Sequence, residues 1–211
     1  MHHQSGAFSE TVYVYGKALD AVFARGGKRF VVVGLGLGYI EMLIAGLSLR
    51  NQCAEHVRLL THESEPLLRS QFLAWTQESL DASDPFARAY EQAARGVGAQ
   101  TDVPIHRLQE ALRNWSASGQ WTLSGALTAE SDTPEKFDGI LYDPFSADTA
   151  PALWTTQFID GFLQKFAAPR CVFASYAATG DLKRTLRKHR FENPKRTGFA
   201  GKRECTLATR A

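Results

Sequence analysis

The stretch R-F-V-V-V-G-L-G-L-G, residues 29–38, most constrains what this chain can fold into. Residues 30–33 form a short apolar run rich in β-branched side chains, which is typical of a buried strand. Gly34, Gly36 and Gly38 follow, and apolar residues then recur at helical spacing. These are Ile40, Leu43, Ile44 and Leu47. Bare backbone and a helix N-terminus can approach a ligand closely, so this order predicts a nucleotide-handling edge of a sheet.

The spacing of the three glycines distinguishes two kinds of ligand. The dinucleotide fingerprint G-x-G-x-x-G places its third glycine where the helix meets the strand, and Tyr39 occupies that position here. The third glycine comes one residue earlier, in a G-x-G-x-G turn that resembles the turn of S-adenosyl-L-methionine (SAM) methyltransferases. SAM has a carboxylate that suits the positive end of a helix. The alternative is a flexible turn without a ligand.

Glu63 lies just past the next predicted strand, residues 57–61. An acidic residue at the tip of the second strand is where folds of this kind bind ribose hydroxyls. A carboxylate can accept two such hydrogen bonds, each stronger than a neutral pair. The order of strand, glycine turn, helix, strand and acid therefore favours a cofactor role for Glu63 over an ordinary solvated loop acid. Glu10, in a turn that contains Gly and Ser near the N-terminus, is a further cofactor-binding candidate.

Composition indicates a single globular domain, residues 1–211, in which residues 1–28 extend the core at its N-terminus. The chain is 44% hydrophobic and 22% charged, which is ordinary for such a domain. No apolar run approaches the roughly 20 residues of a membrane span, and no secretory signal is visible. Cys53, Cys171 and Cys205 lack metal-like spacing, so we expect free thiols, no metal site and a cytoplasmic location.

Charge is unevenly distributed along the chain. Residues 180–211 contain ten Lys or Arg and three Asp or Glu, a local balance of +7, whereas the remaining 179 residues carry −5. Such asymmetry suggests that the C-terminal end faces a polyanion. A solvated helix face would also look basic, so charge alone leaves both readings open.

The remaining elements are predicted from periodicity. Val12 and Val14 alternate with Tyr13 and Tyr15, which predicts a strand before the glycine turn. Helices are predicted from Pro66, from Pro85 to the glycines near 96–98, after Pro151 and after Thr179. Further strands are predicted at 103–107, 138–142 and 171–175, with a polar connection at 120–135. A closing antiparallel pair is predicted from 191 onward and at 204–209.

This alternation predicts an α/β fold with a doubly wound, mostly parallel sheet and a C-terminal antiparallel hairpin. Such an arrangement is typical of Rossmann-like class I SAM methyltransferases. Four motifs in the C-terminal half then narrow the family: D-P-F-S at 143–146, P-A-L-W-T at 151–155, A-S-Y-A-A-T-G-D-L-K-R-T-L from Ala174, and G-F-A-G-K-R-E from Gly198. With G-A-F-S-E-T-V-Y-V-Y and H-E-S-E-P-L nearer the N-terminus, they resemble the methyltransferase domain of the bifunctional tRNA 5-methylaminomethyl-2-thiouridine biosynthesis protein. The resemblance covers most of the chain.

The resemblance implies methyl transfer from SAM to the aminomethyl nitrogen of a modified wobble uridine in tRNA. It implies that Gly34, Gly36, Gly38 and Glu63 hold the cofactor and that Asp143 occupies the catalytic acidic position after the fourth strand. Lys202 and Arg203 fall on the basic loop of the family. Phe145, as a stacking surface for a base, and Arg196, toward phosphates, complete the predicted tRNA site.

The sequence departs from the family at two positions. Pro144 stands where the family usually has Gly or Ala, and the acidic residue expected after the third strand is absent. The oxidase domain that prepares the amine in the bifunctional protein is also missing, so we expect a stand-alone form that works with a separate oxidase.

Two other functions agree with the sequence. D-P-F is similar to the acid-proline-aromatic turn of enzymes that methylate amino groups in nucleic acids, which favours a SAM-dependent N-methyltransferase for another nucleobase or a small amine. A non-catalytic RNA-binding module of the same fold is the third possibility.

Overall fold

The computed structural model describes residues 6–199 and 204–211 and divides the chain into two compact units. Unit 1 comprises Met1–Gly34 and Leu127–Ala211, and unit 2 comprises Leu35–Ala126. The boundary therefore falls inside the glycine turn, between Gly34 and Leu35.

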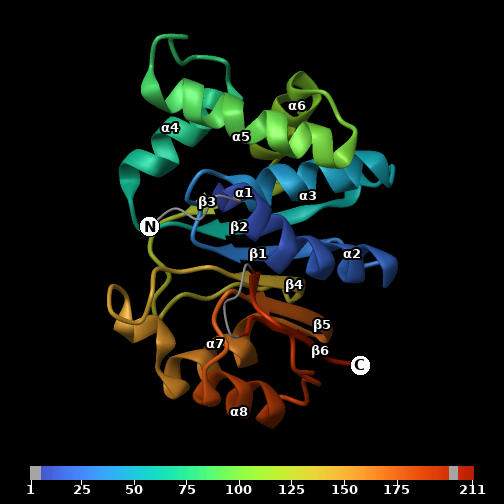
Figure 1. Ribbon diagram of the computed structural model, residues 1–211, viewed down its shortest axis with the longest axis vertical. Helices are drawn as coiled ribbons and strands as arrows, with labels where there is room; N and C mark the ends of the chain where they lie inside the picture. Colours follow the sequence, from blue (N-terminus) through green and yellow to red (C-terminus); the bar gives the residue numbers. More distant parts are fainter. Residues whose placement is uncertain (1–5, 200–203) are drawn as a thin grey trace. The chain divides into compact units, whose positions relative to one another are not determined.

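Four strands form the sheet of unit 1, in the order β1 (Arg29–Val33), β4 (Phe137–Tyr142), β5 (Ala167–Ser175) and β6 (Thr206–Thr209) (Figure 1). The β1–β4 and β4–β5 pairs are parallel, whereas β5 and β6 are antiparallel. Consecutive residues of β1 and β4 are buried, since a parallel sheet is covered on both faces and selects continuous apolar runs.

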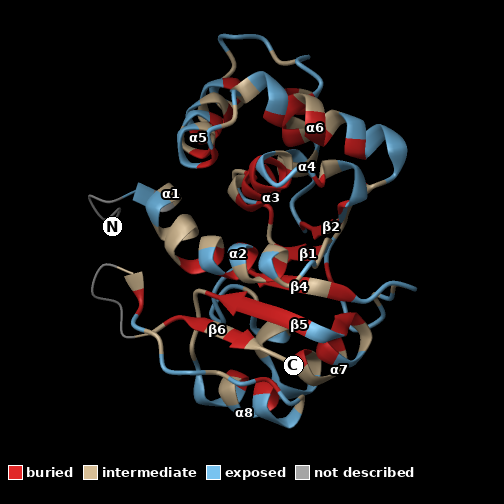
Figure 2. Ribbon diagram, turned by 90° about the vertical axis from the view of Figure 1, so that its right-hand side faces the viewer, coloured by how far each residue is buried: buried red, intermediate tan, exposed pale blue. Residues whose placement is uncertain are grey.

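Helices cover both faces of this sheet, as Figure 2 shows. The N-terminal segment contains α1 (Gly6–Thr11), the π-helix η1 (Val12–Gly16) and α2 (Lys17–Ala24). α2 packs against β4 and β5 on one side, whereas α7 (Thr156–Phe166) and α8 (Gly180–Lys188) lie on the other. A short 3₁₀ helix, η3 (Pro151–Trp154), precedes α7.

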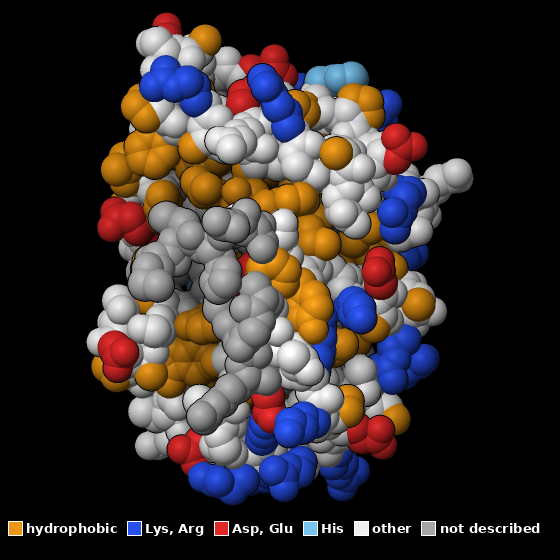
Figure 3. All heavy atoms as spheres, viewed as in Figure 1, with side chains coloured by type: hydrophobic (Ala, Val, Ile, Leu, Met, Phe, Trp, Pro, Cys, Tyr) orange, Lys and Arg blue, Asp and Glu red, His pale blue; other side chains and the backbone are white. Residues whose placement is uncertain are grey.

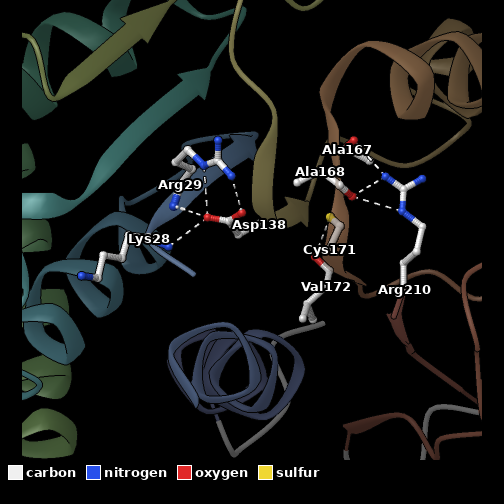
Figure 4. Close-up of polar contacts among 8 residues, drawn as sticks. All are labelled: Lys28, Arg29, Asp138, Ala167, Ala168, Cys171, Val172 and Arg210. Carbon is white, nitrogen blue, oxygen red and sulfur yellow. Dashed lines mark hydrogen bonds and ion pairs between the residues drawn. The ribbon is translucent and has the colours of Figure 1, made fainter. Parts of the chain in front are cut away.

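Polar contacts close the N-terminal ends of the parallel strands (Figure 4). Asp138 accepts hydrogen bonds from the backbone of Lys28 and Arg29 at 3.0 and 3.1 Å and pairs with the Arg29 guanidinium at 2.8 Å. Burial alone would raise the pKa of Asp138, but the bonds from Arg29 and Lys28 outweigh it and lower the pKa. Arg210 donates to the carbonyls of Ala167 and Ala168 at the start of β5. These contacts hold the sheet at the end opposite to Asp143.

Unit 2 consists of the parallel pair β2 (Arg58–His62) and β3 (Trp121–Ser124) with four α-helices. The helices are α3 (Tyr39–Arg50), α4 (Pro66–Thr76), α5 (Pro85–Thr101) and α6 (Ile105–Ser118), and a short 3₁₀ helix, η2 (Ala54–His56), precedes β2. Aromatic rings from α4, α5 and β3 form its core around Phe72. Their centroids lie 5.3–5.8 Å from that of Phe72 and belong to Trp75, Tyr90 and Trp121.

The predicted third strand at 103–107 is wrong. Pro104 is the N-cap residue of α6 there, and the real third strand, β3, lies in the segment predicted as a polar connection. Leu108, Leu112 and Trp115 are buried at helical spacing, so the apolar period of 3.6 overrides the short β-branched run that suggested a strand.

The predicted N-terminal strand is also wrong, because residues 12–15 are helical. Val14 and Tyr15 are adjacent in sequence and both buried, at 1% and 2% exposure. A strand with one buried face would bury only every second residue. The alternation of valine and tyrosine therefore does not correspond to the two faces of a strand.

The C-terminal antiparallel pair is made of other strands than the sequence predicts. β6 pairs with β5, and residue 192 forms only an isolated antiparallel bridge with Thr209. The helix predicted to fade near Gly96 continues to Thr101 as α5. The predicted fold class is nevertheless confirmed: α/β, mostly parallel, with a C-terminal antiparallel pair. No helix in the described ranges is long and apolar enough to cross a membrane, and Cys53, Cys171 and Cys205 are buried free thiols.

Candidate functional site

Asp143 directly continues β4, and its position is fixed by the neighbouring strand. Its backbone N–H donates to the Val33 carbonyl at 2.8 Å, which extends the β1–β4 ladder by one residue. Gly34 adopts a φ of +93°, and a Cβ atom there would lie 2.3 Å from the Asp143 carbonyl oxygen. Only glycine allows this close approach. The first glycine of the turn thus serves to bring two backbone segments of unit 1 together.

Two tyrosines hold the turn that begins at Asp143. Tyr15, from η1, donates to Oδ1 of Asp143 at 2.6 Å, and Tyr176, just past β5, donates to the Pro144 carbonyl at 2.9 Å. Burial raises the pKa of Tyr176 to about 12, and the charge of Asp143 also acts in that direction. Both hydroxyls therefore keep their protons at neutral pH and act as donors.

Phe145 is 60% exposed, although the residue before it is buried. Its carbonyl accepts a 2.7 Å hydrogen bond from the indole of Trp154. This bond fixes the backbone of Phe145, while its ring stays exposed. The Trp154 ring packs edge-on against Tyr142 and Tyr176, with centroids 5.3 and 5.8 Å apart. Unit 1 therefore presents a carboxylate, a buried proline and an exposed aromatic ring in consecutive positions.

Arg196 is engaged by the N-terminal segment. Its guanidinium donates to the carbonyls of Tyr13 and Val14 and lies 4.6 Å above the Tyr13 ring. The Tyr13 hydroxyl returns a 2.8 Å bond to the Thr197 carbonyl. Arg196 thus ties η1 to the segment that leads into the G-F-A-G-K-R motif.

In unit 2, Glu63 fastens the glycine turn to the end of β2. Oε2 accepts from the Leu35 N–H at 2.9 Å and from the Gly36 N–H at 3.5 Å, and Oε1 accepts from the Glu65 N–H at 2.8 Å. A further contact to Oε1, from the Ser64 hydroxyl, is 3.4 Å long. Glu63 is 4% exposed, and these hydrogen bonds hold its carboxylate against the glycine turn.

Gly36 and the start of α3 form a cradle in unit 2. Gly36 is exposed with a φ of +51°, and among the described residues beyond its chain neighbours no heavy atom lies within 4 Å of a Cβ atom placed there. The N-cap residue of α3, Gly38, has no side chain that could cap the helix, and a helix N-terminus favours an anion. A glycine turn before such a helix N-terminus fits a ligand with a carboxylate. Glu63 beside it fits hydroxyl groups.

Most of the other predicted site residues are placed by the structure. Glu10 lies in α1 of unit 1 and is half-buried. Lys202 and Arg203 lie outside the described residues. Sequence reasoning missed Tyr15 and Tyr176, although both belong to the motifs that carried the resemblance. Their membership of those motifs was the available signal, because neither tyrosine is near Asp143 in sequence.

Cations gather on the outer face of α8. Arg184, Arg187 and Lys188 are exposed there, and Arg190 is exposed just past the end of the helix. Figure 3 shows Lys and Arg side chains clustered at the lower edge, where Figure 1 places this helix. Arg184 pairs with Asp181 and Lys188 pairs with Asp160 at 2.8 Å. Lys183 pairs with Glu204 instead of extending outward.

Known proteins are similar to nearly the whole chain, and a family model matches its C-terminal part. A family model described as "S-adenosyl-L-methionine-dependent methyltransferase" matches residues 122–211. The chain is 28% identical over 209 residues to the tRNA 5-methylaminomethyl-2-thiouridine biosynthesis bifunctional protein MnmC of Paraburkholderia phymatum, covering 96% of this chain and 31% of that protein. The protein of the same name from Cupriavidus necator is 27% identical over 218 residues, with coverages of 99% and 31%.

The solved structure of MnmC2 from Aquifex aeolicus has the same fold. It aligns with a TM-score of 0.59 at 18% identity, over 97% of this chain and 61% of that one. The chain spans about a third of the length of the curated relatives that it matches. The resemblance predicted from the sequence is confirmed: residues 122–211 match the methyltransferase family model, and nearly the whole chain is similar to the proteins named MnmC.

Proposed function

We propose that the protein transfers a methyl group from SAM to the aminomethyl nitrogen of a modified wobble uridine in tRNA. The observation that carries the proposal is the Asp143-Pro144-Phe145 turn, in which a fixed carboxylate precedes an exposed aromatic ring. A carboxylate suits an amine, and an exposed ring suits an unstacked base. The names of the relatives point to the same substrate class. Action on tRNA would place the protein in the cytoplasm, where oxidase chemistry would have to prepare the amine.

The chemistry demands a neutral, oriented amine. SAM, when bound, supplies a methyl group on a positively charged sulfur, which becomes a neutral thioether as the carbon–nitrogen bond forms. Asp143 would accept a hydrogen bond from the amine to aim its lone pair and would take up the proton that the product nitrogen releases. Phe145 would stack on the base and hold it beside Asp143, while Tyr176 keeps the backbone of the turn in place.

The residues of unit 2 would hold the cofactor. The N-terminus of α3, with its positive end of the helix dipole, would bind the carboxylate, and Gly36 would leave room for it against bare backbone. Glu63 would accept the ribose hydroxyls by giving up its two long contacts, to Gly36 and Ser64 at 3.5 and 3.4 Å. Its two short bonds, to Leu35 and Glu65, would keep the turn in place.

Glu63→Gln should weaken SAM binding by about 1–3 kcal/mol, the range for a hydrogen bond to a charged group. Glutamine keeps the size of the side chain but replaces one acceptor oxygen by a donor. Isothermal calorimetry measures the loss. Glu65→Gln is the matched control, since Glu65 is exposed and caps α4. If the two variants bind SAM with equal affinity, Glu63 does not contact the cofactor.

The exposed arginines of α8 should contribute to tRNA binding, together with Arg190 just past the end of the helix. Each phosphate contact releases counterions, so affinity should fall steeply with salt concentration. Replacing both Arg187 and Arg190 by Gln should make the logarithmic salt slope shallower by about 2. Filter binding at several salt concentrations measures the slope. Arg95→Gln, an exposed arginine of α5 paired with Glu91, is the control. If the slope equals that of the wild type, these arginines do not contact tRNA phosphates and serve only solubility.

Lys202 and Arg203 keep their proposed place in the tRNA site, and the Arg196 guanidinium contacts η1. Their joint replacement by Gln should weaken tRNA binding and leave SAM binding unchanged.

The proposed function is tested by methyl transfer from labelled SAM to tRNA that carries the free aminomethyl group. Transfer to this tRNA and none to fully modified tRNA supports the proposal. Transfer to both at equal rates favours another nucleobase as the acceptor. Binding of tRNA without transfer favours the non-catalytic module.

A further inference from the structure

The Tyr15 hydroxyl and the Asp143 carboxylate form the shortest polar contact of the turn that carries the proposed chemistry, at 2.6 Å. The two residues are 128 positions apart in sequence and come from η1 and from the end of β4. Tyr15 is only 2% exposed, so water hardly competes for its hydroxyl. A hydrogen bond from a phenol to a carboxylate is charge-assisted and stronger than a neutral one.

The proton of this pair belongs to Tyr15. Burial raises the pKa of Tyr15 well above its ordinary value, and the charge of Asp143 and the bond to it raise the pKa further. Tyr15 therefore donates at neutral pH and cannot act as a base. Of the two groups, only Asp143 can take up a proton. Tyr176 is a second ionisable side chain that interacts with Tyr15.

Tyr176 provides an internal comparison. It contacts the same turn with a hydroxyl of similar character but donates to the main chain, at the Pro144 carbonyl. Tyr176 can fix the path of the turn, whereas Tyr15 also acts on the carboxylate itself. Tyr15 also donates a longer bond, 3.4 Å, to the Tyr142 carbonyl. The two acceptors lie on consecutive residues, which restricts the Tyr15 ring and, through it, the Asp143 side chain.

We propose that Tyr15 is a positioning residue for methyl transfer: its hydrogen bond fixes the Asp143 side chain and stabilises the charged carboxylate that receives the amine. The proposal rests on the function proposed above. It gives the N-terminal segment a part in the reaction, since η1 would hold the acidic group. The anchoring of η1 by Arg196 would then stabilise the same arrangement from outside.

Tyr15→Phe tests the proposal, because it removes the hydroxyl and keeps the ring. We expect kcat to fall about ten- to a hundredfold, the effect of losing one hydrogen bond to a charged group. The acid limb of the kcat–pH profile should move to higher pH, since the carboxylate loses a donor that favours its charged form. SAM affinity and melting temperature should change little.

Two variants distinguish an effect on the Asp143 carboxylate from a loss of support for the backbone of the turn. Tyr13→Phe lies in the same helix and removes a hydroxyl that donates to the Thr197 carbonyl, so its pH profile should match the wild type. Tyr176→Phe should lower kcat without moving the acid limb. Equal acid limbs in Tyr15→Phe and Tyr176→Phe would overturn the proposal, because both tyrosines would then only support the turn.

A measurement without substrate distinguishes this inference from the proposed function. The carboxyl carbon of Asp143, assigned by its loss in Asp143→Asn, can be titrated by ¹³C NMR in the wild type and in Tyr15→Phe. A titration at higher pH in Tyr15→Phe supports the hydrogen bond and its effect, even if the wild type transfers no methyl group to tRNA. Coincident titrations overturn the inference, even if the wild type is active. Should Tyr15→Phe fail to fold, Asp143→Asn gives the reciprocal test: Tyr15 should titrate at lower pH there, and an unchanged titration overturns the inference.

Discussion

Asp143→Asn is expected to lower the rate of methyl transfer by about 10²- to 10⁴-fold, the range for loss of a positioned acid–base group. Asparagine has the size of aspartate, and its carbonyl oxygen can still accept the bond from Tyr15. The backbone bond from residue 143 to Val33 does not involve the side chain. Charge and basicity are therefore the main losses. Single-turnover rates with saturating SAM measure the chemical step.

Asp148→Asn is the matched control, because Asp148 is an exposed acid in the segment that follows the same turn. It should transfer methyl groups at the wild-type rate. SAM affinity and melting temperature should be nearly unchanged in both variants. If Asp143→Asn also reacts at close to the wild-type rate, Asp143 only shapes the turn and the proton acceptor must be sought elsewhere.

Gly36→Val is expected to abolish detectable SAM binding while the protein stays folded. The φ of +51° at Gly36 is costly for a β-branched residue, by roughly 1–2 kcal/mol. Among the residues that the structure describes, apart from the chain neighbours, none has an atom within 4 Å of the added Cβ, so the fold should tolerate it. The valine side chain would instead occupy the space before the N-terminus of α3. Calorimetry with SAM and thermal unfolding measure the two effects separately.

Gly119→Val is the control for backbone strain. Gly119 is the C-cap of α6, has a φ of +75° and also has open space around an added Cβ. Both variants should lose similar stability, and only Gly36→Val should lose the cofactor. Normal SAM affinity in Gly36→Val would show that the glycine turn is not the binding surface.

The sequence predicted well where one local signal agreed with the tertiary structure. The run before Gly34 is apolar at every position and is buried on both faces in β1. In β4, residues 139–142 are likewise buried in succession, so the end of that strand and the position of Asp143 could be foreseen. Glu63 was placed correctly after β2, because strand and acid are adjacent in the chain.

Prediction failed where the local signal was ambiguous or where the contact is long-range. Residues 12–15 alternate like a strand, yet their burial follows a helix. The contact between Tyr15 and Asp143 spans 128 positions and has no local signature. The sequence predicts Arg196 to face phosphates and gives no sign that its guanidinium also binds carbonyls of η1. Its partners become visible only when both segments are placed in unit 1.

Mass analysis of tRNA nucleosides tests the central claim most directly. Transfer RNA carrying the free aminomethyl group would be incubated with SAM and the protein, digested and compared with the same tRNA incubated without the protein. The account predicts that the modified wobble uridine gains one methyl group on its aminomethyl nitrogen and that the Asp143→Asn protein produces far less of it. A methyl group on any other base, or no methylated nucleoside at all, would contradict the account.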